Sequence, residues 1–242
     1  MPALEAVEVS VRFGGTLALD AVGITVEPGV VTGLIGPNGA GKTTLFNVVS
    51  GLLSPTKGRV LLHGQDVTGL APSRRARLGL ARTFQRLELF TSLSVRDNIR
   101  VAGDIRNAWG RGHRINVAKE AERVIELTGL GDVAERDVAD IPTGRARVVE
   151  VARALMSGPS VLLLDEPAAG QTERETETFG NLLKTLAAEG LAVCLVEHDM
   201  ALVMQVSTAI HVLDYGRQLA VGGPEDIRHN PAVIAAYLGG AA

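Results

Sequence analysis

Residues 33–44 read G-L-I-G-P-N-G-A-G-K-T-T, and this stretch constrains the fold and chemistry of the chain more tightly than any other. It fits the phosphate-binding pattern G-x-x-x-x-G-K-S/T. An apolar run of strand length, residues 30–35, precedes the loop, and a helix is expected to follow at residues 45–49. Because an incidental glycine-rich turn seldom fills every position with the correct flanks, the stretch predicts a loop that binds a nucleoside triphosphate.

Each residue type in this loop has a physical task. The glycines let backbone N–H groups point at phosphate oxygens, and the following helix adds the positive end of its dipole. Lys42 is expected to neutralise the β- and γ-phosphates, and the Thr43 hydroxyl to bind Mg²⁺. The predicted nucleotide-binding residues of the loop are Gly36, Pro37, Asn38, Gly39, Ala40, Gly41, Lys42, Thr43 and Thr44.

The bulk properties narrow the class of protein. The 242 residues suit one α/β domain with a small inserted subdomain. A net charge of −3 and a pI near 6.0 argue against a general nucleic-acid binder, so no nucleic-acid partner is expected. A single cysteine, Cys194, favours a reducing compartment. Without a signal peptide or an apolar run near the roughly 20 residues that span a bilayer, a cytoplasmic protein is expected.

Strand-like runs alternate with helical stripes along the chain, which predicts a mainly parallel sheet covered on both faces. Between about residues 70 and 141 arginines cluster and helical spacing replaces strands, so we expect a helical insertion there. Strands are expected at residues 6–12, 22–26, 30–35, 58–63, 161–164, 191–196, 210–213 and 218–221, and helical stripes at residues 117–125, 148–155 and 179–186.

Two adjacent carboxylates, Asp165 and Glu166, end the apolar run 161–164. In phosphate-loop enzymes an acid at this strand end holds Mg²⁺. Since a strand points successive side chains to opposite faces, the two acids can have different tasks. Asp165 is expected to hold Mg²⁺, and Glu166 to polarise the attacking water as general base. An acidic turn after a core strand is the alternative, and the phosphate loop disfavours it.

Two further residues and one turn are candidates for the site, and each can also be explained by a purely structural role. His198 follows the run 191–196 and can donate a hydrogen bond to the γ-phosphate, although a histidine at a strand end is usually structural. Gln85 lies where the chain enters the helical insertion, within reach of the metal and the attacking water; taken alone it is typical of a surface polar group. The turn I-P-T-G-R, residues 141–145, precedes a helix N-terminus that suits an anion or is an ordinary helix start.

In this order the motifs resemble those of the ATP-binding cassette (ABC) transporter ATPases over essentially the whole chain. The resemblance implies that residues 36–43 are the Walker A loop and residues 161–165 Walker B. It implies that Gln85 is the Q-loop glutamine, Glu166 the catalytic glutamate and His198 the switch histidine. Phe13 lies at the upstream aromatic position that stacks on adenine in this family, but a lone phenylalanine can equally be core.

The same resemblance implies an architecture and a set of partners. The expected fold is a P-loop NTPase core with a mainly parallel sheet, an antiparallel N-terminal β subdomain and a helical subdomain inserted at about residues 86–158, in one domain over residues 1–242. ATP and Mg²⁺ are the implied cofactors, with Thr43, Gln85 and Asp165 at the metal. The implied partners are a second ABC ATPase subunit, identical or different, and integral membrane permease subunits that hold the chain on the inner face of the cell membrane.

A closer resemblance is to the ATPases of branched-chain amino acid importers. It rests on V-R-F-G-G-T-L-A-L-D, A-R-T-F-Q-R-L-E-L-F, D-E-P-A-A-G and the ending G-G-P-E-D-I-R-H-N-P-A-V-I-A-A-Y-L-G. It implies import of branched-chain or other small amino acids. An importer or exporter of another solute is an alternative, as is a soluble ABC ATPase of DNA repair or translation, although the chain lacks the coiled-coil insertion or tandem cassettes usual in those.

Two departures from the family pattern fall where the partner ATPase is expected. The signature, usually L-S-G-G-Q, reads I-P-T-G-R, and Pro142 has neither a hydroxyl nor an N–H. Thr143 and Gly144 remain candidates for contacting the partner's nucleotide, and Arg145 can add positive charge. Thr172 stands where an aspartate is common. These departures concern the efficiency of a shared site, not nucleotide binding.

The arginines around the start of the helical insertion form a basic cluster. A solvated face is the favoured interpretation, and contact with a membrane subunit is the alternative. The cluster consists of Arg74, Arg75, Arg77, Arg82 and Arg86.

Overall fold

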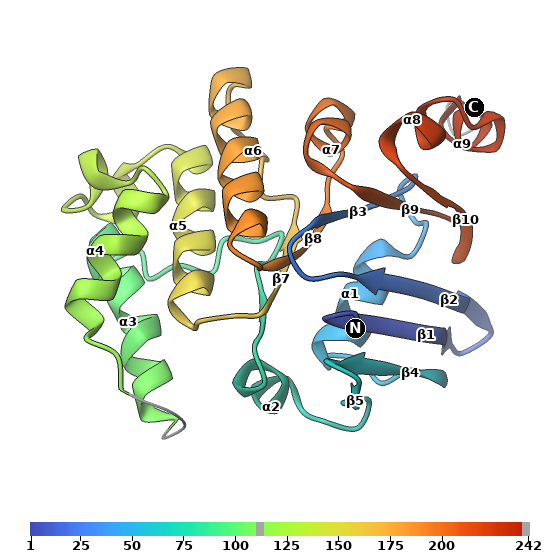
Figure 1. Cartoon of the computed structure of the whole chain (residues 1–242), viewed down its shortest axis with the longest axis horizontal. Helices are drawn as coiled ribbons and strands as arrows, with labels where there is room; N and C mark the ends of the chain where they lie inside the picture. The colour runs from blue at the N-terminus through green and yellow to red at the C-terminus, as the bar shows by residue number, and fades with distance from the viewer. Residues whose placement is uncertain (110–113, 239–242) are drawn as a thin grey trace.

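Two β-sheets pack around the helix that follows the glycine-rich loop (Figure 1). The computed structural model describes residues 1–109 and 114–238 of the chain. Its strands are β1 (Leu4–Phe13), β2 (Thr16–Val26), β3 (Val31–Ile35), β4 (Lys57–Leu62), β5 (Gln65–Asp66), β6 (Leu80–Arg82), β7 (Val161–Asp165), β8 (Ala192–Val196), β9 (Ala209–Asp214) and β10 (Arg217–Gly222). Its α-helices are α1 (Lys42–Ser50), α2 (Pro72–Arg77), α3 (Val95–Ala108), α4 (Val117–Leu127), α5 (Thr143–Met156), α6 (Glu173–Ala188), α7 (Met200–Val206), α8 (Pro224–Arg228) and α9 (Pro231–Leu238).

The larger sheet is mainly parallel. Its strand order is β10-β9-β3-β8-β7-β6, and β10 pairs with β9 in the antiparallel sense. The smaller sheet, in the order β2-β1-β4-β5, is antiparallel throughout. The predicted α/β fold class, with a mainly parallel core sheet and an antiparallel N-terminal sheet, is therefore confirmed.

The apolar runs become strands buried on both faces, as expected for a parallel sheet covered by helices. In β7, Val161 and Leu163 face the core that contains α1 and the smaller sheet. Leu162 and Leu164 face the opposite core, which contains residues of α5 and α6. Helix α1 is therefore enclosed between the two sheets, and its N-terminus is held against the carboxyl edge of the larger sheet.

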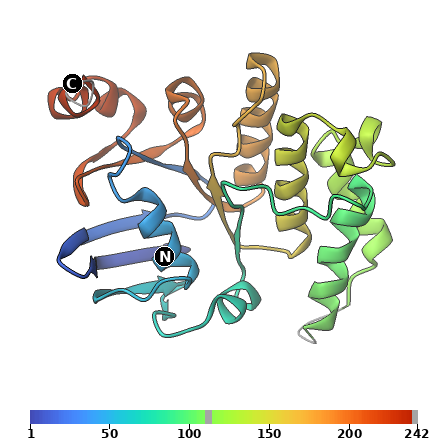
Figure 2. The same ribbon diagram turned by 180° about the vertical axis from the view of Figure 1, so that it is seen from behind.

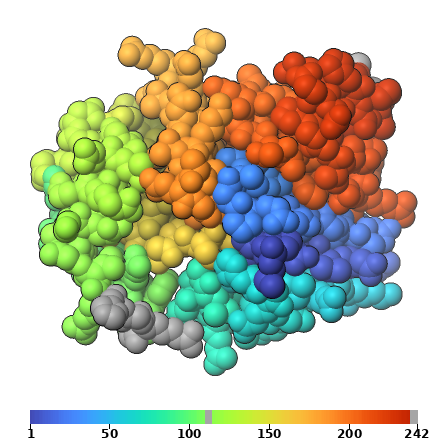
Figure 3. Space-filling view, in the orientation of Figure 1, coloured from blue at the N-terminus to red at the C-terminus, as the bar shows by residue number. Residues whose placement is uncertain are grey.

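Helices α3, α4 and α5 form one end of the molecule, and the C-terminal helices α8 and α9 lie at the other (Figures 2 and 3). Asn116 caps α4 by accepting a hydrogen bond from Lys119 N at 3.1 Å. Among the described residues, no helix combines the length and the apolar character that a membrane crossing requires.

Several predicted boundaries were wrong. Strand β6 lies inside the interval that was expected to contain no strand, and it pairs with β7 through Leu80 and Val161. Three residues are too few to show a period of two, so the pattern could not reveal this strand. The register between β1 and β2 shifts three times, and Glu8 and Ala21 have positive φ. These irregularities interrupt the alternation of apolar and polar side chains, so the sequence pattern did not show the full length of the two strands.

The expectation that the basic cluster is a solvated face was wrong for two of its members. Arg75 is 1% exposed, and the side chain of Arg82 is 7% exposed and paired with Asp165. Arg74, Arg77 and Arg86 are exposed. The buried guanidinium of Arg75 donates to the backbone oxygens of Val48, Val49, Thr68 and Leu70 at 2.7–3.0 Å.

Arg75 therefore stabilises the C-terminal end of α1, where helix carbonyls lack partners and the dipole favours a positive charge. Replacing Arg75 by methionine is expected to lower the free energy of unfolding by about 3 kcal/mol or more, because several buried carbonyls lose their donor at once. Urea denaturation followed by circular dichroism measures the change. Arg74→Met, at an exposed neighbouring position, is the matched control and should leave the midpoint unchanged.

Candidate active site

The phosphate loop joins β3 to α1, and two of its glycines have no substitute. Gly36 has φ +150°, and a Cβ there would lie 2.1 Å from the backbone oxygen of Leu213. Gly41 has φ +104°, and its Cβ would lie 2.7 Å from a methyl group of Leu19. The loop can follow this path only because both positions lack a side chain.

The side chain of Lys42 lies within the loop. Its Nζ donates to the backbone oxygens of Gly36 at 2.6 Å and Pro37 at 3.0 Å. Burial lowers the pKa of Lys42, and the charges of Glu166 and Asp165 oppose that shift. The charge of Lys42 therefore interacts with the two carboxylates that were predicted to serve magnesium binding and catalysis.

The carboxyl ends of β7 and β8 bring the polar candidates together. Asp165 pairs with Val196 in the parallel register, so the residues after each strand are neighbours. Glu166 Oε1 lies 2.7 Å from His198 Nε2, and Gln85 Nε2 donates to Glu166 Oε2 at 3.2 Å. Glu166 also has φ +50°, which is unusual for a residue with a side chain and is frequent at functional sites.

These side chains and the phosphate loop share one cleft of about 470 Å³. Residues of the β1–β2 hairpin and of the β9–β10 turn complete its wall. Its lining consists of Thr16, Leu17, Ala18, Asn38, Gly39, Ala40, Gly41, Lys42, Thr43, Thr44, Gln85, Glu166, His198, Tyr215 and Gly216.

Phe13, the predicted adenine platform, is not among the lining residues of the cleft. It lies at the end of β1, next to the hairpin turn, and is 53% exposed. Tyr215, which sequence reasoning missed, lines the cleft and is 89% exposed. Gly216 N donates to Ala40 O at 3.0 Å, which ties this turn to the phosphate loop. The sequence signal for it was the D-Y-G-R turn between two apolar runs.

The predicted metal ligands supply oxygen donors, which suits Mg²⁺. Asp165 is buried, and its Oδ2 accepts a hydrogen bond from Arg82 Nη2 at 3.0 Å. Thr43 is the second residue of α1, and both Thr43 and Gln85 line the cleft, whereas Asp165 is not among its lining residues. A hydroxyl, an amide and one buried carboxylate beside the phosphate loop therefore fit a hard divalent cation.

Glu197 is a second residue that sequence reasoning did not single out. Its Oε1 accepts from Ala168 N at 2.7 Å and its Oε2 from His198 N at 3.0 Å. Burial raises the pKa of Glu197; the backbone N–H groups of Ala168, His198 and Asp199 oppose that shift, and the charge of Glu166 adds to it. Its position directly after a buried strand was the available signal. Glu197 fixes the backbone on both sides of the catalytic candidates.

The I-P-T-G-R segment was expected to precede the helix. Only Ile141 and Pro142 do so, because Thr143 is already the first residue of α5. A Cβ on Gly144 would lie 3.0 Å from both Gly170 O and Gln171 Cγ, so the helix start packs closely on the loop after β7. Neither Thr143 nor Gly144 lines the phosphate-loop cleft. The structure therefore separates these two candidates from the rest of the site within one chain.

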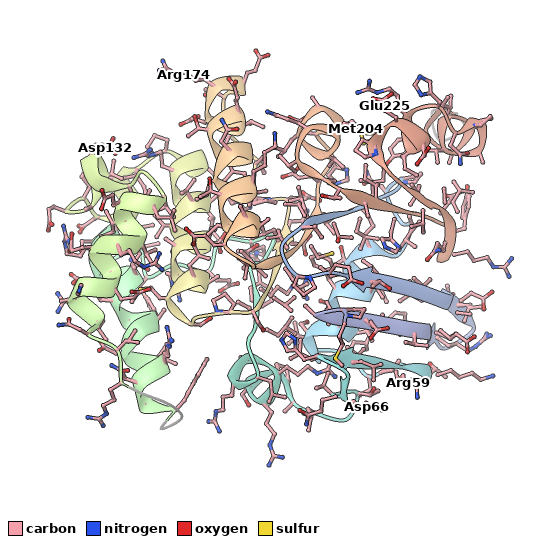
Figure 4. All side chains as sticks on the ribbon, viewed as in Figure 1. Arg59, Asp66, Asp132, Arg174, Met204 and Glu225 are labelled. Atoms are coloured by element: carbon pink, nitrogen blue, oxygen red, sulfur yellow. The ribbon has the colours of Figure 1, made fainter. Side chains whose placement is uncertain are left out.

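Arg145 and Thr172, which depart from the family pattern, both form contacts within the chain. Arg145 bonds to Gly129 O at 3.0 Å and forms an ion pair with Asp132, which Figure 4 labels at the helical end of the molecule. Its guanidinium is thus paired within the chain. Thr172 caps α6 in a capping box with Glu175, which explains why a threonine serves at this position.

Comparisons with known proteins agree with this arrangement. Residues 19–169 match the family model described as ABC transporter, and residues 217–242 match one described as branched-chain amino acid ATP-binding cassette transporter. The high-affinity branched-chain amino acid transport ATP-binding protein BraF of Pseudomonas aeruginosa is 40% identical, over 98% of each chain. The corresponding protein LivG of Escherichia coli K12 is 39% identical, also over 98% of each chain.

A solved structure gives the same result. The ADP conformation of MJ1267, an ATP-binding cassette of an ABC transporter, matches with a TM-score of 0.87 and 28% identity over 99% of both chains. The core fold, the strand-end acids and the phosphate loop are those expected of such a cassette. The chain belongs to the ABC transporter family, as an ATP-binding and ATP-hydrolysing subunit.

Proposed function

We propose that this subunit drives the import of branched-chain amino acids or closely related small amino acids. The observation that carries the proposal is the match of residues 217–242 to the C-terminal model of branched-chain amino acid cassettes. The names of the full-length relatives support the same substrate class. Permease subunits in the membrane would carry the amino acid, and this chain on their cytoplasmic side would supply the energy.

Uptake of labelled leucine by a strain that lacks the gene tests this substrate. Uptake is expected to fall and to return when the intact chain is supplied, but not when Lys42→Ala is supplied. Lys42 lies against the phosphate loop, so its loss removes the charge that binds the phosphates. Unchanged leucine uptake in the deletion strain would contradict the substrate and favour an importer of another small solute.

The geometry of the cleft supports a division of tasks in hydrolysis. Lys42 and the loop N–H groups would hold the phosphates, and Thr43, Asp165 and Gln85 would hold Mg²⁺, which neutralises phosphate charge when bound. Glu166 would take the proton of the attacking water. His198, 2.7 Å from Glu166, would orient that carboxylate and contact the γ-phosphate.

The signature of a second cassette would complete the site. Since Thr143 and Gly144 do not line this chain's own cleft, they would contact the nucleotide bound to a partner ATPase, identical or different. Head-to-tail pairing of two such subunits would then produce two shared sites. Closure of the pair on ATP and opening after hydrolysis would move the permease subunits.

The adenine platform allows a direct test. Phe13→Ala is expected to weaken ATP binding about 5-fold to 150-fold, because stacking of a base on an aromatic ring contributes about 1–3 kcal/mol. Binding of inorganic triphosphate, which has no base, should not change. Isothermal titration of both ligands measures this, with Tyr215→Ala in parallel. A loss of ATP affinity in Tyr215→Ala alone would move the platform from Phe13 to Tyr215.

A further inference from the structure

Arg82 is buried next to the active site but has no task in the division of roles above. Its Nη2 donates to Asp165 Oδ2 at 3.0 Å, and the two side chains are 7% and 4% exposed. Its Nη1 donates to Asn47 Oδ1 at 2.7 Å and to Ser50 Oγ at 3.0 Å. One guanidinium therefore joins the carboxylate at the end of β7 to the helix that follows the phosphate loop.

Two aromatic rings contact the same guanidinium. Its Cζ lies 5.5 Å from the ring centroid of Phe46 on α1 and 5.1 Å from that of Phe84, the residue before Gln85. The buried Nε of Arg82 has no hydrogen-bond partner, so the rings and the two Nη groups hold this side chain. Cation–π contacts of this kind gain strength when the cation is desolvated. A lysine has no planar fork and cannot reproduce the whole set.

We propose that Arg82 is a positioning residue for the magnesium site. It fixes Oδ2 of Asp165 and so leaves Oδ1 for the metal or a water bound to it. The backbone of Asp165 is fixed as well, because its N–H donates a hydrogen bond to Thr83 Oγ1 at 3.2 Å. The inference rests on the proposed role of Asp165 in holding Mg²⁺.

Groups that orient a metal ligand from outside the coordination shell commonly change metal affinity by about 10-fold to 100-fold when they are removed. Arg82 is placed to act in this way on Asp165. The Arg82–Asp165 pair is buried, and α1, Phe46 and Phe84 hold the guanidinium in position. Arg82 contacts only one of the two oxygens of Asp165. The predicted effect is therefore on magnesium dependence and not on nucleotide binding itself.

The experiment measures binding of a fluorescent ATP analogue to the full chain at increasing Mg²⁺ concentration, and again in EDTA. In Arg82→Met the half-saturating Mg²⁺ concentration is expected to rise about tenfold or more, with a smaller rise in Arg82→Lys. Affinity in EDTA should not change in either variant. Arg77→Met, an exposed arginine of the same cluster, is the control and should match the unmodified chain in both conditions.

A purely structural role for Arg82 would lower affinity in EDTA and in Mg²⁺ in parallel, with no shift of the Mg²⁺ midpoint; this result would overturn the proposal. Arg82→Lys provides the measurement if Arg82→Met does not fold. Asp165→Asn separates the two claims. An unshifted midpoint in Asp165→Asn contradicts the role of Asp165 in the proposed function. A shift in Asp165→Asn without one in the Arg82 variants contradicts only the role of Arg82.

Discussion

Glu166→Gln is expected to lower kcat for ATP hydrolysis by about 100-fold or more, because a general base contributes about 10²–10⁴-fold. Glutamine keeps the size of the side chain, and its amide oxygen can still accept a hydrogen bond from Gln85 or His198. It cannot accept a proton from water. The change therefore removes the chemical task and retains the shape of the cleft, so ATP binding should be unchanged.

Single-turnover hydrolysis and equilibrium binding of ATP measure the two effects separately. Glu177→Gln, on the exposed side of α6, is the matched control and should hydrolyse ATP at the rate of the unmodified chain. Undiminished hydrolysis by Glu166→Gln would remove the general-base assignment. A parallel loss of ATP binding would instead show that the substitution disturbs the phosphate loop.

The phosphate loop and the strand-end acids could be predicted because their chemistry is local in sequence. The path of the backbone requires glycine at Gly36 and Gly41, and the apolar run 161–164 together with Asp165 forms β7. The parallel sheet followed from the same runs, since apolar residues without alternation indicate burial on both faces. These features depend on neighbours within a few positions, which one sequence displays in full.

Contacts across long sequence separations could not be predicted in the same way. Arg75 and Arg82 looked like members of one solvated basic cluster, yet each binds partners that are distant in sequence. Only the tertiary fold shows that Arg75 reaches Val48 at the end of α1 and that Arg82 reaches Asp165. Composition assigns an arginine to the surface by default, because buried arginines are rare unless they are paired.

The position of the signature is a second case. The resemblance implied that Thr143 and Gly144 contact the nucleotide of a partner subunit, and the structure, which has them at the start of α5 and outside this chain's cleft, is compatible with that role. A residue that acts on a partner's ligand has no contact within its own chain to reveal that role. The separation becomes informative once it is combined with the symmetry of a pair of subunits.

Two inactive variants of this chain are expected to restore ATPase activity when they are mixed. Lys42→Ala removes the loop charge, and Gly144→Val places a branched side chain against Gly170 and Gln171. Each change alone should lower hydrolysis by about 100-fold or more, as the loss of a transition-state contact commonly does. In a head-to-tail pair of the two variants, both defects fall in one shared site. The other site keeps an intact loop and an intact signature.

Mixing equal amounts should therefore recover at most about a quarter of the unmodified activity, since half of the pairs are mixed and each has one intact site. Lys42→Ala mixed with the double variant Lys42→Ala/Gly144→Val should stay inactive, because no combination of those chains yields an intact site. Thermal denaturation of Gly144→Val checks that the substitution leaves the fold in place. If the mixture of single variants is no more active than its parts, two copies of this chain do not complete each other's sites. The proposed role of Thr143 and Gly144 would then be limited to a pair with a different ATPase subunit.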